Sequence, residues 1–202
     1  MSTARDLALI ALNLPPDRTV ERGDLSLALA GAEAIDLLET GALILDGDRL
    51  VPAPGASATD DSLLDQAITS LVRQEPYETV EDWLWRRGSG LAASYAKHLE
   101  GAGLIVSPNA RGFRLRTARS VPYDAPERRQ AEERWASGEP VLAALTAILR
   151  IGDTPSDDHE IPAGDTAAKV LGATGDAVTE LQAVRLRRGV EDAAFDNIWR
   201  GF

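Results

Sequence analysis

The sequence predicts a mainly α-helical protein, a compact multi-helix single domain over residues 1–202 with one or two short β-hairpins. Three observations carry this prediction. Apolar residues recur at helical spacing over most of the chain, glycines and prolines divide it into segments of helical length, and few stretches alternate as strands do. An apolar share of 44% with 26% charged residues is typical of a globular protein of this length.

Two helices are expected near the N-terminus. Residues 6–14 form a short apolar segment that stops at Pro15 and Pro16, and residues 24–39 form an Ala/Leu-rich segment that ends at Gly41. Because the second segment is apolar almost all round, it is predicted to lie deep in the core.

A hairpin and a third helix follow. Residues 42–45 and 49–52 flank a turn in which Gly47 can adopt positive φ, as a tight hairpin requires. Residues 59–72 carry apolar residues at helical spacing, with aspartates in the first turn, where a helix favours negative charge.

The next two helices are separated by glycines. Thr79 and Asp82 resemble a capping box that opens a helix, although the usual partner residue is Glu or Gln. Gly88 and Gly90 break the path before a second helix over residues 91–100.

The first of these helices carries two tryptophans, Trp83 and Trp85. Residues two apart point to opposite sides of a helix. Trp83 is expected in the core and Trp85 near the surface.

The rest of the chain is predicted as one hairpin followed by helices. Residues 103–116 read as two short strands around a turn, since Phe113 and Leu115 alternate with Arg114 and Arg116. Four helices are then expected, and their ranges are 126–136, 140–150, 165–171 and 176–199.

Positive charge is concentrated in residues 83–119. This segment holds seven basic residues against Glu100, a balance of +6, so the remainder of a chain with net charge -11 sums to -17. Such segregation is typical of a protein with one face for an anionic partner. The basic residues are Arg86, Arg87, Lys97, Arg111, Arg114, Arg116 and Arg119.

No catalytic, cofactor or metal motif is recognisable, so we expect no enzyme, no cofactor and no metal. The chain has no cysteine, and His98 and His159 are too far apart for a histidine metal motif. Residues 88–93 match a dinucleotide fingerprint formally, but a capped helix precedes them where a strand is required. The acidic residues between 153 and 160 lack the spacing of a calcium loop.

The expected location is the cytoplasm, with peripheral attachment to the inner face of the membrane. The N-terminus lacks the pattern of an export signal, and no stretch approaches the length of a spanning helix. The preference for arginine over lysine, with abundant alanine and glycine, indicates a GC-rich bacterial genome.

Several segments in order resemble the Golgi phosphoprotein 3 family. The resemblance is strongest over residues 5–125 and loose over residues 126–202. The segments that carry it are residues 7–12 (LALIAL), 38–43 (LETGAL), 61–67 (DSLLDQA), 79–84 (TVEDWL) and 97–105 (KHLEGAGLI).

The resemblance implies a mostly helical domain with an exposed hairpin, no enzymatic activity and peripheral membrane binding through phosphatidylinositol 4-phosphate. The family's lipid pocket uses one tryptophan and three arginines. In register, those positions hold Glu21, Ala30, Ser89 and Ala92 here. None matches, so the phosphoinositide site does not transfer residue by residue.

A basic face that contacts anionic phospholipid headgroups is therefore the leading prediction. Its cations are Arg22, Arg86, Arg87, Arg111, Arg114, Arg116 and Arg119. In the family the hairpin contributes to self-association and bilayer contact, which implies the same role for Leu104, Ile105, Val106, Phe113 and Leu115.

Two other classes of function stay open. A helix followed by an Arg-rich hairpin also resembles a winged-helix nucleic-acid binder, although the net charge of -11 and the single cation of that helix, Lys97, argue against it. A scaffold that forms homo-oligomers through the hairpin, without lipid, is the other alternative. A glycosidase-like carboxylate pair is a residual one.

Overall fold

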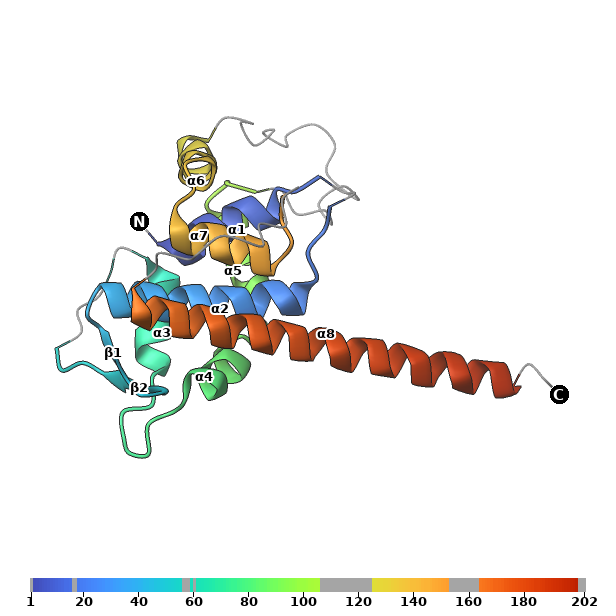
Figure 1. Cartoon of the computed structure of the whole chain (residues 1–202). Helices are drawn as coiled ribbons and strands as arrows, with labels where there is room; N and C mark the ends of the chain where they lie inside the picture. Colours follow the sequence, from blue (N-terminus) through green and yellow to red (C-terminus); the bar gives the residue numbers. More distant parts are fainter. Residues whose placement is uncertain are drawn as a thin grey trace.

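The computed structural model describes residues 2–15, 18–55, 59, 61–105, 125–152 and 164–199, with side chains described as far as Glu191. It confirms a mainly α-helical fold with one short hairpin in this part of the chain (Figure 1). The elements are α1 (Thr3–Leu12), α2 (Arg22–Glu39), β1 (Leu43–Asp46), β2 (Arg49–Pro52), α3 (Ser62–Ser70), α4 (Val80–Arg87), α5 (Leu91–Gly101), α6 (Pro126–Ala136), α7 (Pro140–Ile148) and α8 (Asp165–Trp199).

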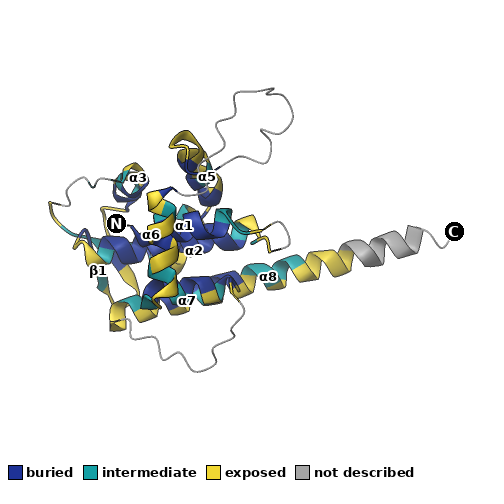
Figure 2. Cartoon of the chain, turned by 90° about the horizontal axis from the view of Figure 1, so that it is seen from above, coloured by how far each residue is buried: buried dark blue, intermediate teal, exposed yellow. Residues whose placement is uncertain are grey.

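Helix α2 lies at the centre of the fold, as its apolar sequence predicts. Every residue from 24 to 37 is buried, and the helix contacts α1, α4, α5 and α8 (Figures 1 and 2). Its acidic residues Glu33 and Asp36 are buried as well. Because a buried carboxylate needs partners, these two acids organise the neighbouring helices.

Helix α8 runs antiparallel to α2 at short range. Two small residues of α2 permit this approach, since a Cβ at Gly31 would overlap Thr174 and one at Gly23 would overlap Arg185 and lie 2.8 Å from Leu181. Glycine at these positions lets the two backbones come close enough to bury the inner face of α8.

The hairpin and the α4 cap follow the predicted geometry. Leu43 pairs with Pro52, and Gly47 in the turn has φ of +64°. Thr79 and Asp82 form the full capping box at the start of α4, with the Asp82 amide donating to the Thr79 hydroxyl at 3.0 Å.

The two tryptophans of α4 lie as predicted. Trp83 is fully buried and donates its indole N–H to the Ala30 carbonyl at 2.9 Å. Trp85, two residues later, remains 37% exposed.

One predicted boundary is wrong: the expected helices over residues 165–171 and 176–199 form one continuous helix, α8. Gly172 and Gly175 lie in the gap between the two predicted helices, but the α2 and α7 surfaces bury the apolar face of α8 on both sides of them. Tertiary packing thus outweighs the low helix propensity of glycine.

The predicted hairpin over residues 103–116 lies outside the described residues from position 106 onward. Leu104 and Ile105 lie within the predicted range and are described, and their burial contradicts the prediction that they contact the bilayer or a second copy. Each is 8% exposed and belongs to the hydrophobic core.

Candidate functional site

A surface hollow of about 350 Å³ lies where the start of α2, the turn between α4 and α5, and helix α8 meet. Basic, aromatic, small and apolar side chains share its wall. The residues are Arg22, Gly23, Ser26, Leu27, Trp85, Gly88, Ser89, Gly90 and Leu181.

The α4–α5 turn is fixed against α2 by close backbone packing. A Cβ at Gly88 would lie 2.5 Å from the Leu84 carbonyl oxygen and 3.3 Å from that of Ser26. Gly90, which precedes α5, has φ of +73°. The Ala92 amide donates to the Ser26 hydroxyl at 3.0 Å. These constraints hold Ser89 at the rim of the hollow, where it is exposed.

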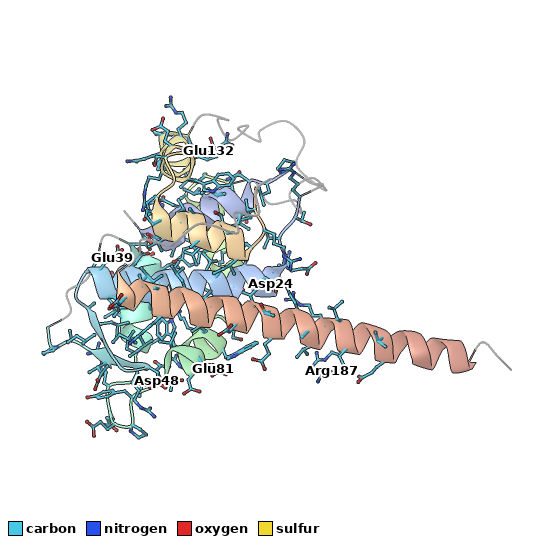
Figure 3. The ribbon with its side chains drawn as sticks, viewed as in Figure 1. Asp24, Glu39, Asp48, Glu81, Glu132 and Arg187 are labelled. Carbon is cyan, nitrogen blue, oxygen red and sulfur yellow. The ribbon has the colours of Figure 1, made fainter. Side chains whose placement is uncertain are left out.

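The charge of the hollow resides mainly on Arg22. Its side chain is exposed and forms no ion pair among the described residues. The nearby Asp24 is buried and accepts from Arg185 at 2.6 Å and from Gln182 at 3.0 Å (Figure 3). Since Asp24 balances Arg185, the Arg22 guanidinium is available to an anionic group.

Two other predicted cations are engaged in internal ion pairs. Arg86 donates from Nε and Nη2 to Glu78 at 2.7 to 3.0 Å, and its guanidinium lies 5.3 Å from the centre of the Trp83 ring. Arg87 donates to Glu33 at 2.7 and 2.9 Å and to the Leu63 carbonyl at 3.2 Å. The structure therefore brings Arg22 to the hollow and gives Arg86 and Arg87 structural roles.

The four positions at which the family pocket has its tryptophan and arginines divide into two groups. Ala30 is fully buried and Ala92 is 4% exposed, so both face the core. Glu21 and Ser89 are exposed, and Ser89 lines the hollow. Of these four positions, Ser89 alone lines the hollow.

The remaining predicted site residues lie outside the described residues. They are Val106, Arg111, Phe113, Arg114, Leu115, Arg116 and Arg119. Sequence reasoning also missed two walls of the hollow, Trp85 and Leu181. The expected surface position of Trp85 was a usable signal, but no local pattern places Leu181 beside residues more than 90 positions away in the chain.

A second cavity, of about 310 Å³, lies between α1, the end of α2, the start of α3 and α6. Two of its acidic residues, Asp36 and Asp6, connect helices of the fold. Asp36 accepts from the Ser2 hydroxyl and from the amides of Thr3 and Ala4 at 2.9 to 3.0 Å, which anchors the start of α1. Asp6 forms an ion pair with Arg134 of α6. Burial raises the pKa of both carboxyls.

Two further findings concern the described part of the chain. No three histidine, aspartate or glutamate side chains in it gather closely enough to hold a metal ion. None of its helices combines the length and the apolar character that crossing a membrane requires.

Comparison with known proteins identifies the family. The family model described as Golgi phosphoprotein 3 (GPP34) matches residues 4–192, which is nearly the whole chain. Searches of curated proteins and of solved structures returned no match. The matched region includes α1, the central α2, the hollow and most of α8, so the chain belongs to the Golgi phosphoprotein 3 family.

Proposed function

We propose that this protein is a peripheral, non-enzymatic membrane protein that binds anionic phospholipid headgroups at the hollow between α2, the α4–α5 turn and α8. One observation carries the proposal. Arg22 and Trp85 line the same hollow, both are exposed, and Arg22 has no acidic partner among the described residues. Family membership supports a membrane role but leaves the headgroup open.

The chemistry of the hollow suits a phosphate-bearing headgroup. An arginine near an anionic bilayer contributes about 1 kcal/mol, and a tryptophan prefers the interface between headgroups and acyl chains. Gly88 and Gly90 add no side chain that would obstruct a headgroup.

Selectivity for a phosphoinositide is not part of the proposal. Ala30 and Ala92, at two of the four family pocket positions, are buried, so substituting arginine there would require an opening of the core. We expect recognition of anionic lipid in general, reinforced by the basic residues Arg111, Arg114, Arg116 and Arg119.

Vesicle flotation tests the proposal. Wild-type protein is mixed with neutral vesicles, with vesicles of phosphatidylglycerol or cardiolipin, and with vesicles of phosphatidylinositol 4-phosphate, each at low and physiological salt. We expect binding to all anionic vesicles, weakened by salt because the contact is electrostatic. Absence of flotation in every mixture contradicts the proposal.

Two variants and one control locate the contact. Arg22→Glu and Trp85→Ala should each reduce flotation severalfold. Lys169→Glu makes the same charge change at an exposed position near the start of α8. Since Leu181 lies beside Gly23 and Thr174 beside Gly31, Lys169 lies towards the opposite end of α2 from Arg22. An Arg22→Glu protein that floats as well as the Lys169→Glu protein overturns the assignment of the hollow.

A further inference from the structure

The C-terminal half of α8 extends beyond the rest of the molecule (Figures 1 and 2). The inner face of α8 packs on the body through Val178 and Leu181, and Arg185 makes the last ion pair with α2. From residue 186 to residue 191 every side chain is exposed. Leu186 and Val190 are 73% and 70% exposed, which is unusual for large apolar side chains on a helix.

This projecting segment lacks the packing that stabilises the first half of α8. Most helical stability in proteins comes from tertiary packing of an apolar face, and residues 186–191 have none within the described part of the chain. Gly189 lowers its propensity by roughly 1 kcal/mol relative to alanine, and the β-branched Val190 lowers it slightly further. Contact along Leu186 and Val190 would supply the missing stabilisation.

Leu186 and Val190 belong to a series of positions with coiled-coil spacing. Successive members are separated by four and three residues, the spacing of a helix–helix seam. The seam positions are Thr179, Ala183, Leu186, Val190, Ala193 and Asn197. The body-facing residues of α8, among them Ala177, Val178 and Leu181, lie on a different side of the helix, so the seam is accessible to another helix.

We propose that the exposed seam of α8 binds the α8 helix of a second copy of this chain in antiparallel orientation. The seam is self-complementary about residue 188. A two-fold axis there places Leu186 opposite Val190 of the other copy, Ala183 opposite Ala193, and Thr179 opposite Asn197. Each of these contacts occurs twice, once on either side of the axis, which is the reciprocity that defines an isologous interface.

The charges on the flank of the seam favour the same orientation. Arg187 and Glu191 are exposed, and neither forms an ion pair in the described part of its own chain (Figure 3 shows Arg187 on the projecting segment). In the antiparallel arrangement Arg187 of each copy lies about 3 Å along the axis from Glu191 of the other, within reach of an arginine side chain. A parallel pair offers Arg187 only Gln182 or Gly189 across the seam.

An anionic membrane is a weaker candidate for this surface. Between residues 183 and 199, Arg185, Arg187 and Arg188 are balanced by Glu191, Asp192 and Asp196, so the segment has no net positive charge. The surface area buried between two helix ends is small compared with the roughly 1,200 Å² or more that stable interfaces bury. The association should therefore be weak and should depend on protein concentration.

Light scattering and sedimentation of the full-length protein over a wide concentration range test this inference. We expect the mass to rise from the 21.6 kDa of one chain towards twice that value. Leu186→Glu with Val190→Glu should abolish the rise. Ile44→Glu, which removes a 54% exposed apolar residue from β1, should leave it unchanged. A wild-type protein that remains one chain at every concentration overturns the proposal.

A charge exchange identifies the pairing itself. Arg187→Glu and Glu191→Arg should each weaken self-association about tenfold, because two attractive pairs become repulsive. A mixture of the two variants should form a heterodimer of wild-type strength, since the glutamate introduced in one variant then meets the arginine introduced in the other. This rescue cannot come from pairs within one chain. Self-association that neither variant alters, or a mixture that shows no rescue, excludes the α8 interface and indicates a different surface.

Discussion

The guanidinium of Arg87 forms a two-point ion pair with the carboxylate of Glu33, at 2.7 Å from Nε to Oε2 and 2.9 Å from Nη2 to Oε1. Glu33 is fully buried in α2 and also accepts from the Tyr95 hydroxyl of α5 at 3.1 Å. One carboxylate therefore joins the helices α2, α4 and α5, and it fixes the turn that forms a wall of the hollow.

The two adjacent arginines of α4 should differ strongly in their contribution to stability. Arg87→Ala leaves the buried Glu33 unpaired and should lower the free energy of unfolding by about 3 to 5 kcal/mol. Arg86 makes a similar pair with Glu78, whose side chain is 7% exposed, but Arg86 itself is 43% exposed against 14% for Arg87. Removing Arg86 therefore opens the Glu78 carboxylate to water, so Arg86→Ala should cost only about 1 kcal/mol. Urea unfolding followed by circular dichroism measures both, and equal losses would contradict the argument from burial.

The close crossing of α2 and α8 predicts a specific steric effect. Gly31→Ala should destabilise the protein by roughly 1 to 3 kcal/mol, because the new methyl group overlaps the buried Thr174 side chain. Combining it with Thr174→Ala should recover part of the loss. Gly172→Ala is the matched control in a helix with free space, and it should be neutral or stabilising by up to about 1 kcal/mol. Thermal unfolding would refute this account if both glycine variants behaved alike.

Stability should increase on mild acidification. Burial raises the pKa of Asp6, Glu33 and Asp36, outweighing the hydrogen bonds and charges that lower it. The folded state therefore retains protons that the unfolded state releases above a pKa of about 4. This stabilising contribution is complete below the unfolded pKa and is lost as the pH rises through the folded values.

Urea midpoints measured from pH 7 down to about pH 4, the ordinary pKa of a carboxyl, check the sign of the pH dependence. The contribution of these three carboxyls should raise the midpoints as the pH falls. Asp36→Asn should flatten the dependence, since it removes one of the titrating groups. A pH dependence that is the same in the wild-type and Asp36→Asn proteins would show that Asp36 does not have a raised pKa in the folded protein.

The capping box of α4 should have a smaller, local effect. Thr79→Ala removes the hydroxyl that accepts from the Asp82 amide at 3.0 Å and should cost about 1 kcal/mol. Thr79→Ser keeps the acceptor and should retain most of the stability. If the alanine and serine variants unfold at the same urea concentration, the cap contributes nothing measurable.

Local sequence determined most of the helices and the hairpin. Helix α6 begins at the predicted Pro126, a residue favoured at the first helical position, and it spans the predicted residues. Gly47 marks the turn between β1 and β2, and the predicted capping box at Thr79 is present. The all-round apolar character of α2 also identified the centre of the core. These features depend on residues within a few positions of one another, which is why the sequence alone reveals them.

Tertiary structure decided the features that join distant segments. The partners of Arg86 and Arg87 could not be read from a local charge count, because Glu33 lies 54 positions before Arg87. The continuity of α8 through Gly172 and Gly175 depends on burial against α2 and α7. The hollow forms only where Arg22 of α2, Trp85 of α4 and Leu181 of α8 lie next to one another in space. Long-range packing sets these relationships, since the free energy of burying a side chain depends on what the rest of the chain places around it.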